Sequence, residues 1–467
     1  MYTEITYVQY AYEKKEAEHM SKESTLLSNT LDKMETFFSR KYGIANSVST
    51  GNVPLYITSD YKKQSLGNSI PMYTSAVGCA TSALGGAISL NRDNSRIKAF
   101  GEFIERYCSS LKNRQQIENI IFDSYDNLTE SEIYCLYPSD LMPFDEHQYE
   151  NPDFIISKYN TATPISWVKG KNLTCNKECW IPAQKVFLNY PYAEGEKLHI
   201  YSLSTGLACG SSFEHAAVGG ILEVIERDSF MLTWLLKRPG VKIEMDSIRN
   251  GDLRALYSHI CKYLTGEDRL HIYDISKTNG VYTILTFIRN DLPSAYGLLI
   301  SAASHIDPEI ALLKSLEELC QCQRFAYSNL FKDEKKEIQN FTKQDITDLH
   351  KHFFYYSSSK HNSNIDFISS TRESINLSEM VNFAKSGDKE TLEYLIQLLK
   401  KNGMHVYVAD ITMPEFYESG FKVIKAIIPG YIDLEWSHHV RQFNYSRLKM
   451  YQRKYNVDIN LEPHPFP

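Results

Sequence analysis

Residues 216–236 combine apolar side chains on nearly every side of a helix with two carboxylates and an arginine. The segment reads AAVGGILEVIERDSFMLTWLL, and a helix that is apolar nearly all round is usually buried. Glu223, Glu226 and Arg227 share one face because they lie at positions i, i+3 and i+4. A buried carboxylate is costly without a partner. The segment therefore predicts a core helix whose acidic face meets a cation, a ligand or an internal salt bridge.

The same Glu-x-x-Glu-Arg motif occurs earlier in the chain, as Glu102, Glu105 and Arg106 in GEFIERY. Four carboxylates that face each other could hold hard cations such as Mg²⁺, and two Arg forks could hold phosphates. The first copy also fits an ordinary solvated helix face. An apolar stripe lies opposite its carboxylates, formed by Phe100, Phe103, Ile104 and Tyr107. The repetition of the motif favours a ligand site over that simpler interpretation.

Two glycine-containing breaks precede the acidic helices. Ala83-Leu84-Gly85-Gly86 predicts a turn that either brings backbone N–H groups to an anion or only joins two elements. Gly210-Ser211-Ser212 leaves free N–H groups at the start of the second helix, which suits either a cap or a phosphate.

A third helix is expected from residue 310. It carries Glu318, Gln321 and Arg324 at spacings of three residues. Taken alone, these residues are most simply a polar stripe on a packed helix.

The composition excludes several classes of protein. The 467 residues suffice for one large core or for two to three domains. A net charge of −7 gives no basic footprint for nucleic acid. No apolar run approaches the ~20 residues of a membrane span, and the N-terminus lacks the pattern of a secretory signal. We therefore expect a cytoplasmic protein with neither a membrane span nor a nucleic-acid partner.

Changes in composition divide the chain. Residues 1–75 are expected to form an N-terminal docking region, helical at first and then built of short strands. Residues 76–467 are expected to form the catalytic domain. Within that domain, residues 331–375 are the most polar stretch and predict a surface excursion.

The chain closes with alternating prolines, PHPFP at 463–467. Such a sequence favours an extended, polyproline-like rod, whereas chain ends are normally frayed. Either the tail has no role, or it places the carboxylate of Pro467 at a fixed depth inside a site.

Taken together, these segments resemble one known family. They are the paired Glu-x-x-Glu-Arg motifs, TGLACGSS, the Glu-x-x-Gln-x-x-Arg helix, the DIT and IIPGY strands, NYSRL at 444–448 and the terminal PHPFP. They look like a YcaO-domain protein from about residue 40 to the terminus. More narrowly, they resemble the subunit that forms azoline rings in ribosomal peptides.

The resemblance implies an α+β fold, with helices packed on mostly antiparallel sheets around an internal nucleotide site. It also implies ATP-dependent cyclodehydration of Cys, Ser or Thr residues in a precursor peptide. The Mg²⁺ ligands would be Glu102, Glu105, Glu223 and Glu226. The nucleotide contacts would be Arg106, Ser211, Glu214, Arg227, Glu318, Gln321 and Arg324. The residues at the reaction centre would be Pro467 and Arg447.

The resemblance also implies partners. Besides the precursor peptide, these are a separate E1-like leader-binding protein and an FMN-dependent dehydrogenase that oxidises azolines. A homodimer within a larger complex is the expected assembly.

Leu84, Lys98 and His215 depart from the family pattern. They motivate one alternative, a scaffold subunit with little or no turnover. Thioamide formation on a peptide backbone is a second alternative, against which the PHPFP terminus argues.

Overall fold

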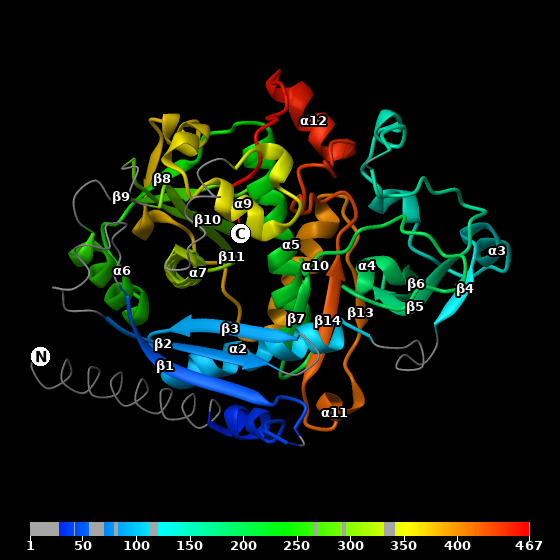
Figure 1. Ribbon diagram of the computed structural model, residues 1–467, viewed down its shortest axis with the longest axis horizontal. Helices are drawn as coiled ribbons and strands as arrows, with labels where there is room; N and C mark the ends of the chain where they lie inside the picture. Colours follow the sequence, from blue (N-terminus) through cyan, green and yellow to red (C-terminus); the bar gives the residue numbers. More distant parts are fainter. Residues whose placement is uncertain are drawn as a thin grey trace, which may run out of the picture. The chain divides into compact units, whose positions relative to one another are not determined.

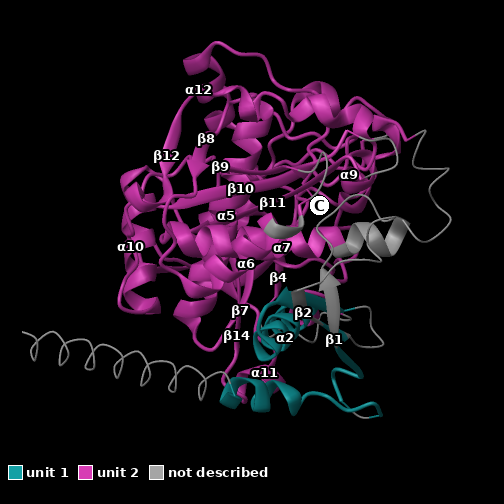
Figure 2. Cartoon of the chain, turned by 90° about the vertical axis from the view of Figure 1, so that its left-hand side faces the viewer, with its two compact units in different colours: residues 1–53, 71–106 teal, residues 54–70, 107–467 magenta. Residues whose placement is uncertain are grey.

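The computed structural model describes residues 28–41, 43–55, 70–78, 83–111, 120–152, 154–264, 269–291, 296–330 and 341–466. The chain forms two compact units (Figure 2). Unit 1 comprises Met1–Val53 and Pro71–Arg106, and unit 2 comprises Pro54–Ile70 and Tyr107–Pro467.

Unit 1 contains a three-stranded sheet and the helix that carries the first acidic motif. The strands lie in the order β1 (Ser47–Leu55), β2 (Ile70–Gly78) and β3 (Leu84–Ser89), and the helix is α2 (Arg92–Cys108). Phe100, Phe103 and Ile104 are fully buried, which confirms the predicted apolar stripe. Gly85 packs so tightly on α2 that a Cβ would lie 2.1 Å from the Ala99 carbonyl oxygen.

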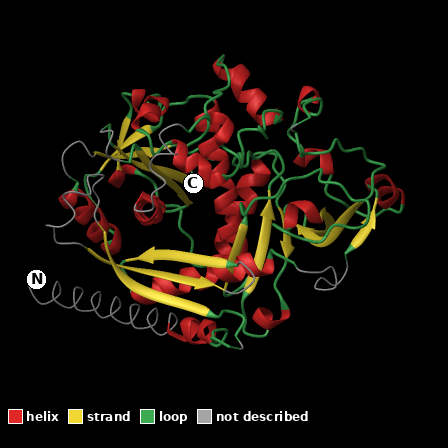
Figure 3. Cartoon of the chain, viewed as in Figure 1, coloured by secondary structure: helices red, strands yellow, loops and turns green. Residues whose placement is uncertain are grey.

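The described part of unit 2 contains two sheets (Figure 3). The first runs in the order β11-β10-β9-β8-β12. Its strands are β8 (Val241–Glu244), β9 (Arg269–Asp274), β10 (Tyr282–Arg289), β11 (Leu298–His305) and β12 (Ser374–Asn376). Its pairings are antiparallel except for the parallel pair β8–β12.

The second sheet runs in the order β4-β5-β13-β14-β7, and β6 pairs with β5. Its strands are β4 (Ile121–Asp123), β5 (Ile165–Asn172), β6 (Lys177–Pro182), β7 (Leu207–Gly210), β13 (Tyr407–Asp410) and β14 (Lys422–Ile427). Its pairings are antiparallel. Helices on mostly antiparallel sheets confirm the predicted α+β class.

Helix α5 (Phe213–Leu235) is the central helix of unit 2 (Figure 1). It packs on β7 and β14 of one sheet and on β10 and β11 of the other, and α10 (Asp388–Lys401) also packs on it. Most of its residues are buried, as its apolar circumference predicts. Helix α7 (Pro308–Leu330) covers β10 and β11, and α6 (Gly251–Tyr263) packs on α7.

The remaining helices of unit 2 are short. They are α3 (Tyr125–Glu130), α4 (Ala183–Val186), α9 (Leu349–Tyr355), α11 (Pro414–Tyr417) and α12 (Ser446–Tyr455). No described helix is long and apolar enough to cross a membrane.

The polar stretch 331–375 differs from the surface excursion that its composition suggests. Residues 331–340 lie outside the described part of the chain. In the remainder, Tyr356, Ile365 and Ile368 are buried and belong to one hydrophobic core with Trp234 and Phe466. Scattered apolar residues in this stretch meet only after α9 and the following 3₁₀ turns form, so average polarity hides them.

Candidate nucleotide and metal site

The first acidic motif is held by a strand of its own unit. The Gly86 N–H donates to Glu102 Oε2 at 2.8 Å, and Arg106 Nη2 lies 3.4 Å from Glu102 Oε1. Glu105 lies one turn further along α2 and is half-buried. The predicted Gly85-Gly86 turn is wrong, because these residues belong to strand β3. The Gly86 N–H does contact an anion, which is the Glu102 carboxylate.

The second motif repeats this arrangement on α5. The Gly206 N–H donates to Glu223 Oε2 at 3.0 Å, and Arg227 Nη2 lies 3.3 Å from Glu223 Oε1. Glu226 has a further anchor, because the Ser304 N–H of β11 donates to its Oε2 at 3.0 Å. Arg227 Nη1 lies 3.3 Å from Glu226 Oε1. Both carboxylates are therefore fixed by backbone N–H groups and joined by one guanidinium.

A third strand–helix pair has the same spacing. In β3–α2, β7–α5 and β11–α7 the helix begins three residues after the strand ends, and a glutamate is its eleventh residue. Those glutamates are Glu102, Glu223 and Glu318. In α7, Gln321 takes the place of the second glutamate and Cys322 the place of the arginine. The chain thus contains three versions of one local module, a regularity that motif reading missed.

The carboxylates of unit 2 influence each other. Burial raises the pKa of Glu226, Arg227 opposes that shift, and the charges of Glu318 and Glu223 add to it. Arg227 keeps its charge, because these three carboxylates outweigh the effect of its burial and raise its pKa. Glu318 of α7 therefore lies close enough to act on α5. A bound cation would favour the charged form of Glu226, because it would offset the burial and the repulsion that raise the pKa of that carboxyl.

The remaining predicted nucleotide contacts are more scattered. Glu214 lies in the first turn of α5, roughly 13 Å along the helix axis from Glu223, and Ser211 precedes the helix. Ser212, rather than Ser211, caps the helix, because its Oγ accepts from the His215 N–H at 3.0 Å. Gln321 is exposed on α7. The side chain of Arg324 and all of Pro467 lie outside the described part of the structure.

Arg447 forms a buried ion pair with Asp228, the residue that follows Arg227. Its Nη2 is 3.0 Å from Asp228 Oδ2, and its guanidinium covers the Tyr431 ring at 4.3 Å. Burial raises the pKa of Asp228 to about 7, and the charge of Arg447 opposes this rise. These contacts tie α12 to α5, and a role for Arg447 in the reaction stays a prediction.

The C-terminal tail reaches the second motif. Arg227 covers the Phe466 ring at 4.4 Å from its centroid, and Phe466 packs on Phe230 at 4.7 Å between centroids. Phe466 is only 3% exposed. The structure therefore brings together three predicted features of unit 2, which are the carboxylate pair, its arginine and the proline-rich terminus.

The donors present fit Mg²⁺ and ATP. No group of three or more His, Cys, Asp or Glu side chains that could hold a metal occurs in the described ranges. Magnesium is commonly held by one or two carboxylates together with phosphate oxygens, so a pair of glutamates on each helix suits it. Backbone N–H groups orient Glu102, Glu223 and Glu226 in advance.

Comparisons with known proteins identify the family. A family model described as YcaO cyclodehydratase, ATP- and Mg²⁺-binding, matches residues 88–432. An uncharacterized protein of Methanothermobacter thermautotrophicus is 24% identical over 357 residues, which cover 74% of this chain and 82% of that protein.

Solved structures share the fold at low sequence identity. A heterocyclase in complex with substrate and cofactor has a TM-score of 0.74 and 17% identity, covering 94% of this chain and 57% of that one. This chain therefore spans little more than half of that heterocyclase. The YcaO protein of Methanopyrus kandleri, bound with AMPPCP and Mg²⁺, has a TM-score of 0.56 and 16% identity, with 90% of each chain covered.

The E. coli microcin synthetase complex McbBCD contains a further similar chain. Its TM-score is 0.56 and its identity 18%, with 78% of this chain and 86% of that one covered. The family model spans most of this chain, so the protein belongs to the YcaO cyclodehydratase family, which binds ATP and Mg²⁺.

Proposed function

We propose that this protein uses ATP to cyclise Cys, Ser or Thr residues of a ribosomal precursor peptide into thiazolines or oxazolines. The observation that carries the proposal is the doubled Glu-x-x-Glu-Arg motif within the YcaO match, with the first glutamate of each copy held by a glycine N–H. Such fixed carboxylates suit phosphoryl transfer, which depends mainly on positioning and cation charge.

In this proposal, Glu102, Glu105, Glu223 and Glu226 hold Mg²⁺ on ATP. Nucleotide contacts come from Arg106, Ser211, Glu214, Arg227, Glu318, Gln321 and Arg324. The ion pairs from Arg227 to Glu223 and Glu226 support this assignment, because a guanidinium beside the metal ligands can turn its donors to phosphate oxygens. The bound Mg²⁺ supplies charge that stabilises the phosphates.

The chemistry has to remove an amide oxygen. The substrate thiol or hydroxyl loses its proton and bonds to the preceding carbonyl carbon, which converts that carbonyl oxygen to an oxyanion. The oxyanion bonds to the γ-phosphorus as the bond to ADP breaks. The C–O bond then breaks, phosphate leaves, and loss of the amide proton forms the C=N bond. We assign Pro467, through its carboxylate, to accept or direct a proton, and Arg447 to support that end of the site.

The expected partners remain part of the proposal. They are the precursor peptide, an E1-like leader-binding protein and an FMN-dependent dehydrogenase, with a homodimer inside a larger cytoplasmic complex. Similarity to a chain of the microcin synthetase complex supports assembly with other subunits.

The test is ring formation by the purified chain with Mg-ATP, a precursor peptide and a leader-binding protein. We expect ADP release and the loss of one water mass per ring. Exchange of oxygen for sulfur would indicate thioamide formation instead. Deleting Pro467, or adding residues after it, should stop ring formation while ATP still binds. Normal turnover by such a variant would remove Pro467 from the reaction.

A scaffold subunit without turnover is the second candidate. Its basis is the exposed Leu84, at 67% of its full area, and the exposed His215, whose Nδ1 lies 3.3 Å from Ser211 Oγ. Absence of ADP release with every combination of peptide and partner would favour it.

A further inference from the structure

Residues 460–464 form an unusual segment in which five consecutive backbone carbonyls each accept a hydrogen bond from a side chain. Arg441 donates to Asn460 O at 3.3 Å and to Leu461 O at 3.0 Å. Trp234 Nε1 donates to Glu462 O at 3.0 Å. Tyr356 Oη donates to Pro463 O at 2.6 Å, and His352 Nδ1 donates to His464 O at 2.9 Å. We call these four side chains the carbonyl ladder.

The ladder replaces a missing strand partner. Prolines lack an N–H, so an alternating proline segment is unsuited to regular sheet pairing, while its buried carbonyls still need donors. Four side chains from three segments of unit 2 supply them, since His352 and Tyr356 belong to α9 and its C-cap. The tail can therefore run through the core without an unsatisfied carbonyl at residues 460–464.

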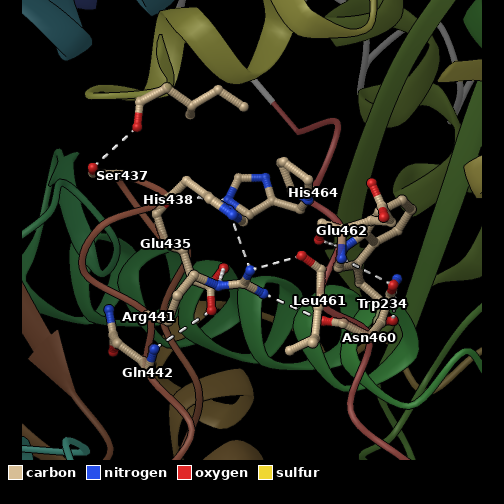
Figure 4. A network of polar contacts seen from close by, with 12 residues as sticks. Trp234, Glu435, Ser437, His438, Arg441, Gln442, Asn460, Leu461, Glu462 and His464 are labelled. Carbon is tan, nitrogen blue, oxygen red and sulfur yellow. Dashed lines mark hydrogen bonds and ion pairs between the residues drawn. The ribbon is translucent and has the colours of Figure 1, made fainter. Parts of the chain in front are cut away.

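The ladder's donors are themselves fixed. Arg441 Nε lies 2.6 Å from Glu435 Oε2, and Arg441 Nη1 lies 3.2 Å from His438 Nδ1 (Figure 4). The His352 and His464 rings stack at 4.0 Å with 8° between their planes. His464 Nε2 donates to the Glu435 carbonyl at 2.9 Å. One small network of contacts therefore fixes both the orientation of the donor side chains and the position of the His464 ring.

We propose that the carbonyl ladder fixes the register of the tail, so that Phe466 lies beneath Arg227. Trp234, His352, Tyr356 and Arg441 are therefore positioning residues. A slip by one residue would remove the His464 ring from His352 and the Phe466 ring from Arg227 together. This role deepens the proposed function, on which its consequence for ring formation rests.

The first experiment compares two neighbouring tyrosines. Tyr356→Phe removes one ladder donor, whereas Tyr355→Phe alters the neighbouring tyrosine, which is also buried and stacks on His361 at 3.8 Å. The readout is digestion by a carboxypeptidase that accepts proline, followed by intact mass. We expect Tyr356→Phe to lose the tail roughly ten times faster than the unaltered chain, because a buried carbonyl loses its donor. Tyr355→Phe should match the unaltered chain.

Equal digestion of the two variants would overturn the ladder. The same variants are then assayed for rings formed per ADP released, with the affinity for Mg-ATP measured separately. We expect Tyr356→Phe to lower that ratio and to leave the affinity unchanged. If even the unaltered chain forms no rings, the proposed reaction is wrong. The digestion rates still show whether the carbonyl ladder holds the tail.

A second pair of variants separates hydrogen bonding from packing. His352→Asn keeps an amide donor near the position of Nδ1, whereas His352→Leu removes it and stays apolar. We expect the tail of His352→Asn to be digested more slowly than that of His352→Leu. The reverse order would show that ring packing, rather than donation to the His464 carbonyl, holds the tail.

Discussion

Helices α2 and α5 carry the same Glu-x-x-Glu-Arg motif in different surroundings. On α2 the motif residues are half-buried, and Glu102 is anchored by Gly86. On α5 both glutamates accept from backbone N–H groups, and the tail contacts the arginine. We infer that the carboxylates of α5 are held more rigidly than those of α2.

The glycines that anchor the two motifs also differ, in the space that surrounds them. Gly206 has φ +84°, and a Cβ there would lie 2.2 Å from the Ala426 carbonyl oxygen. At Gly86 the nearest atom to a new Cβ is Ser75 O, at 3.9 Å. Equivalent hydrogen bonds therefore come from Gly86, where a side chain would fit, and from Gly206, where it would not.

The largest expected effect comes from neutralising one carboxylate on each helix. Glu226→Gln should reduce ATP hydrolysis more than about 100-fold, because an amide replaces a carboxylate that is proposed to hold Mg²⁺ at the phosphates. Glu105→Gln should reduce it less. ADP release measures both, and thermal unfolding controls for folding. Similar rates in Glu226→Gln and the unaltered chain would remove Glu226 from the metal site.

The glycine pair tests the anchoring. Gly206→Ala should destabilise the protein by about 3 kcal/mol, because the new Cβ overlaps a backbone oxygen at a positive φ. It should also raise the Mg²⁺ concentration needed for half-maximal hydrolysis. Gly86→Ala is the matched control and should change stability by less than about 1 kcal/mol. Equal effects at both positions would contradict the difference between the helices.

Acid should loosen the tail that contacts α5. Burial lowers the pKa of His352 to about 3 and that of His464 well below its usual value. Unfolded histidines bind protons below about pH 6.5, so stability is retained above that pH and lost as the pH falls further. His352 alone should cost about 2 kcal/mol at pH 5. Denaturant unfolding at pH 7 and pH 5 measures this loss, which should shrink in His352→Asn.

The smallest effect is expected from replacing the arginine of each motif with lysine. Arg227→Lys should lower kcat/KM for ATP roughly tenfold, because a lysine lacks the planar fork that joins Glu223, Glu226 and the Phe466 ring. Arg106→Lys should have a smaller effect on the more open α2. A larger loss at Arg106 would reverse our ranking of the two helices.

Much of the fold and of the candidate site could be predicted from the sequence, because periodicity and motifs are local. The buried α5, the apolar stripe of α2 and the α+β class follow from residue patterns. The anchoring N–H groups of Gly86, Gly206 and Ser304 carry no side-chain signal, so no motif reveals them. The buried residues of 341–375 were likewise missed, since their contacts lie about a hundred residues away at the tail.

The ladder also bears on how the chain acquires its structure. Trp234 and Glu462 are separated by 228 positions, and Tyr356 and Pro463 by 107. Closing such long loops is entropically costly, and non-local contacts slow folding. We expect insertion of the tail to be among the last events, with the sheets and α5 assembling first. Burial of Phe466 would then mark the step at which a collapsed chain becomes a competent one.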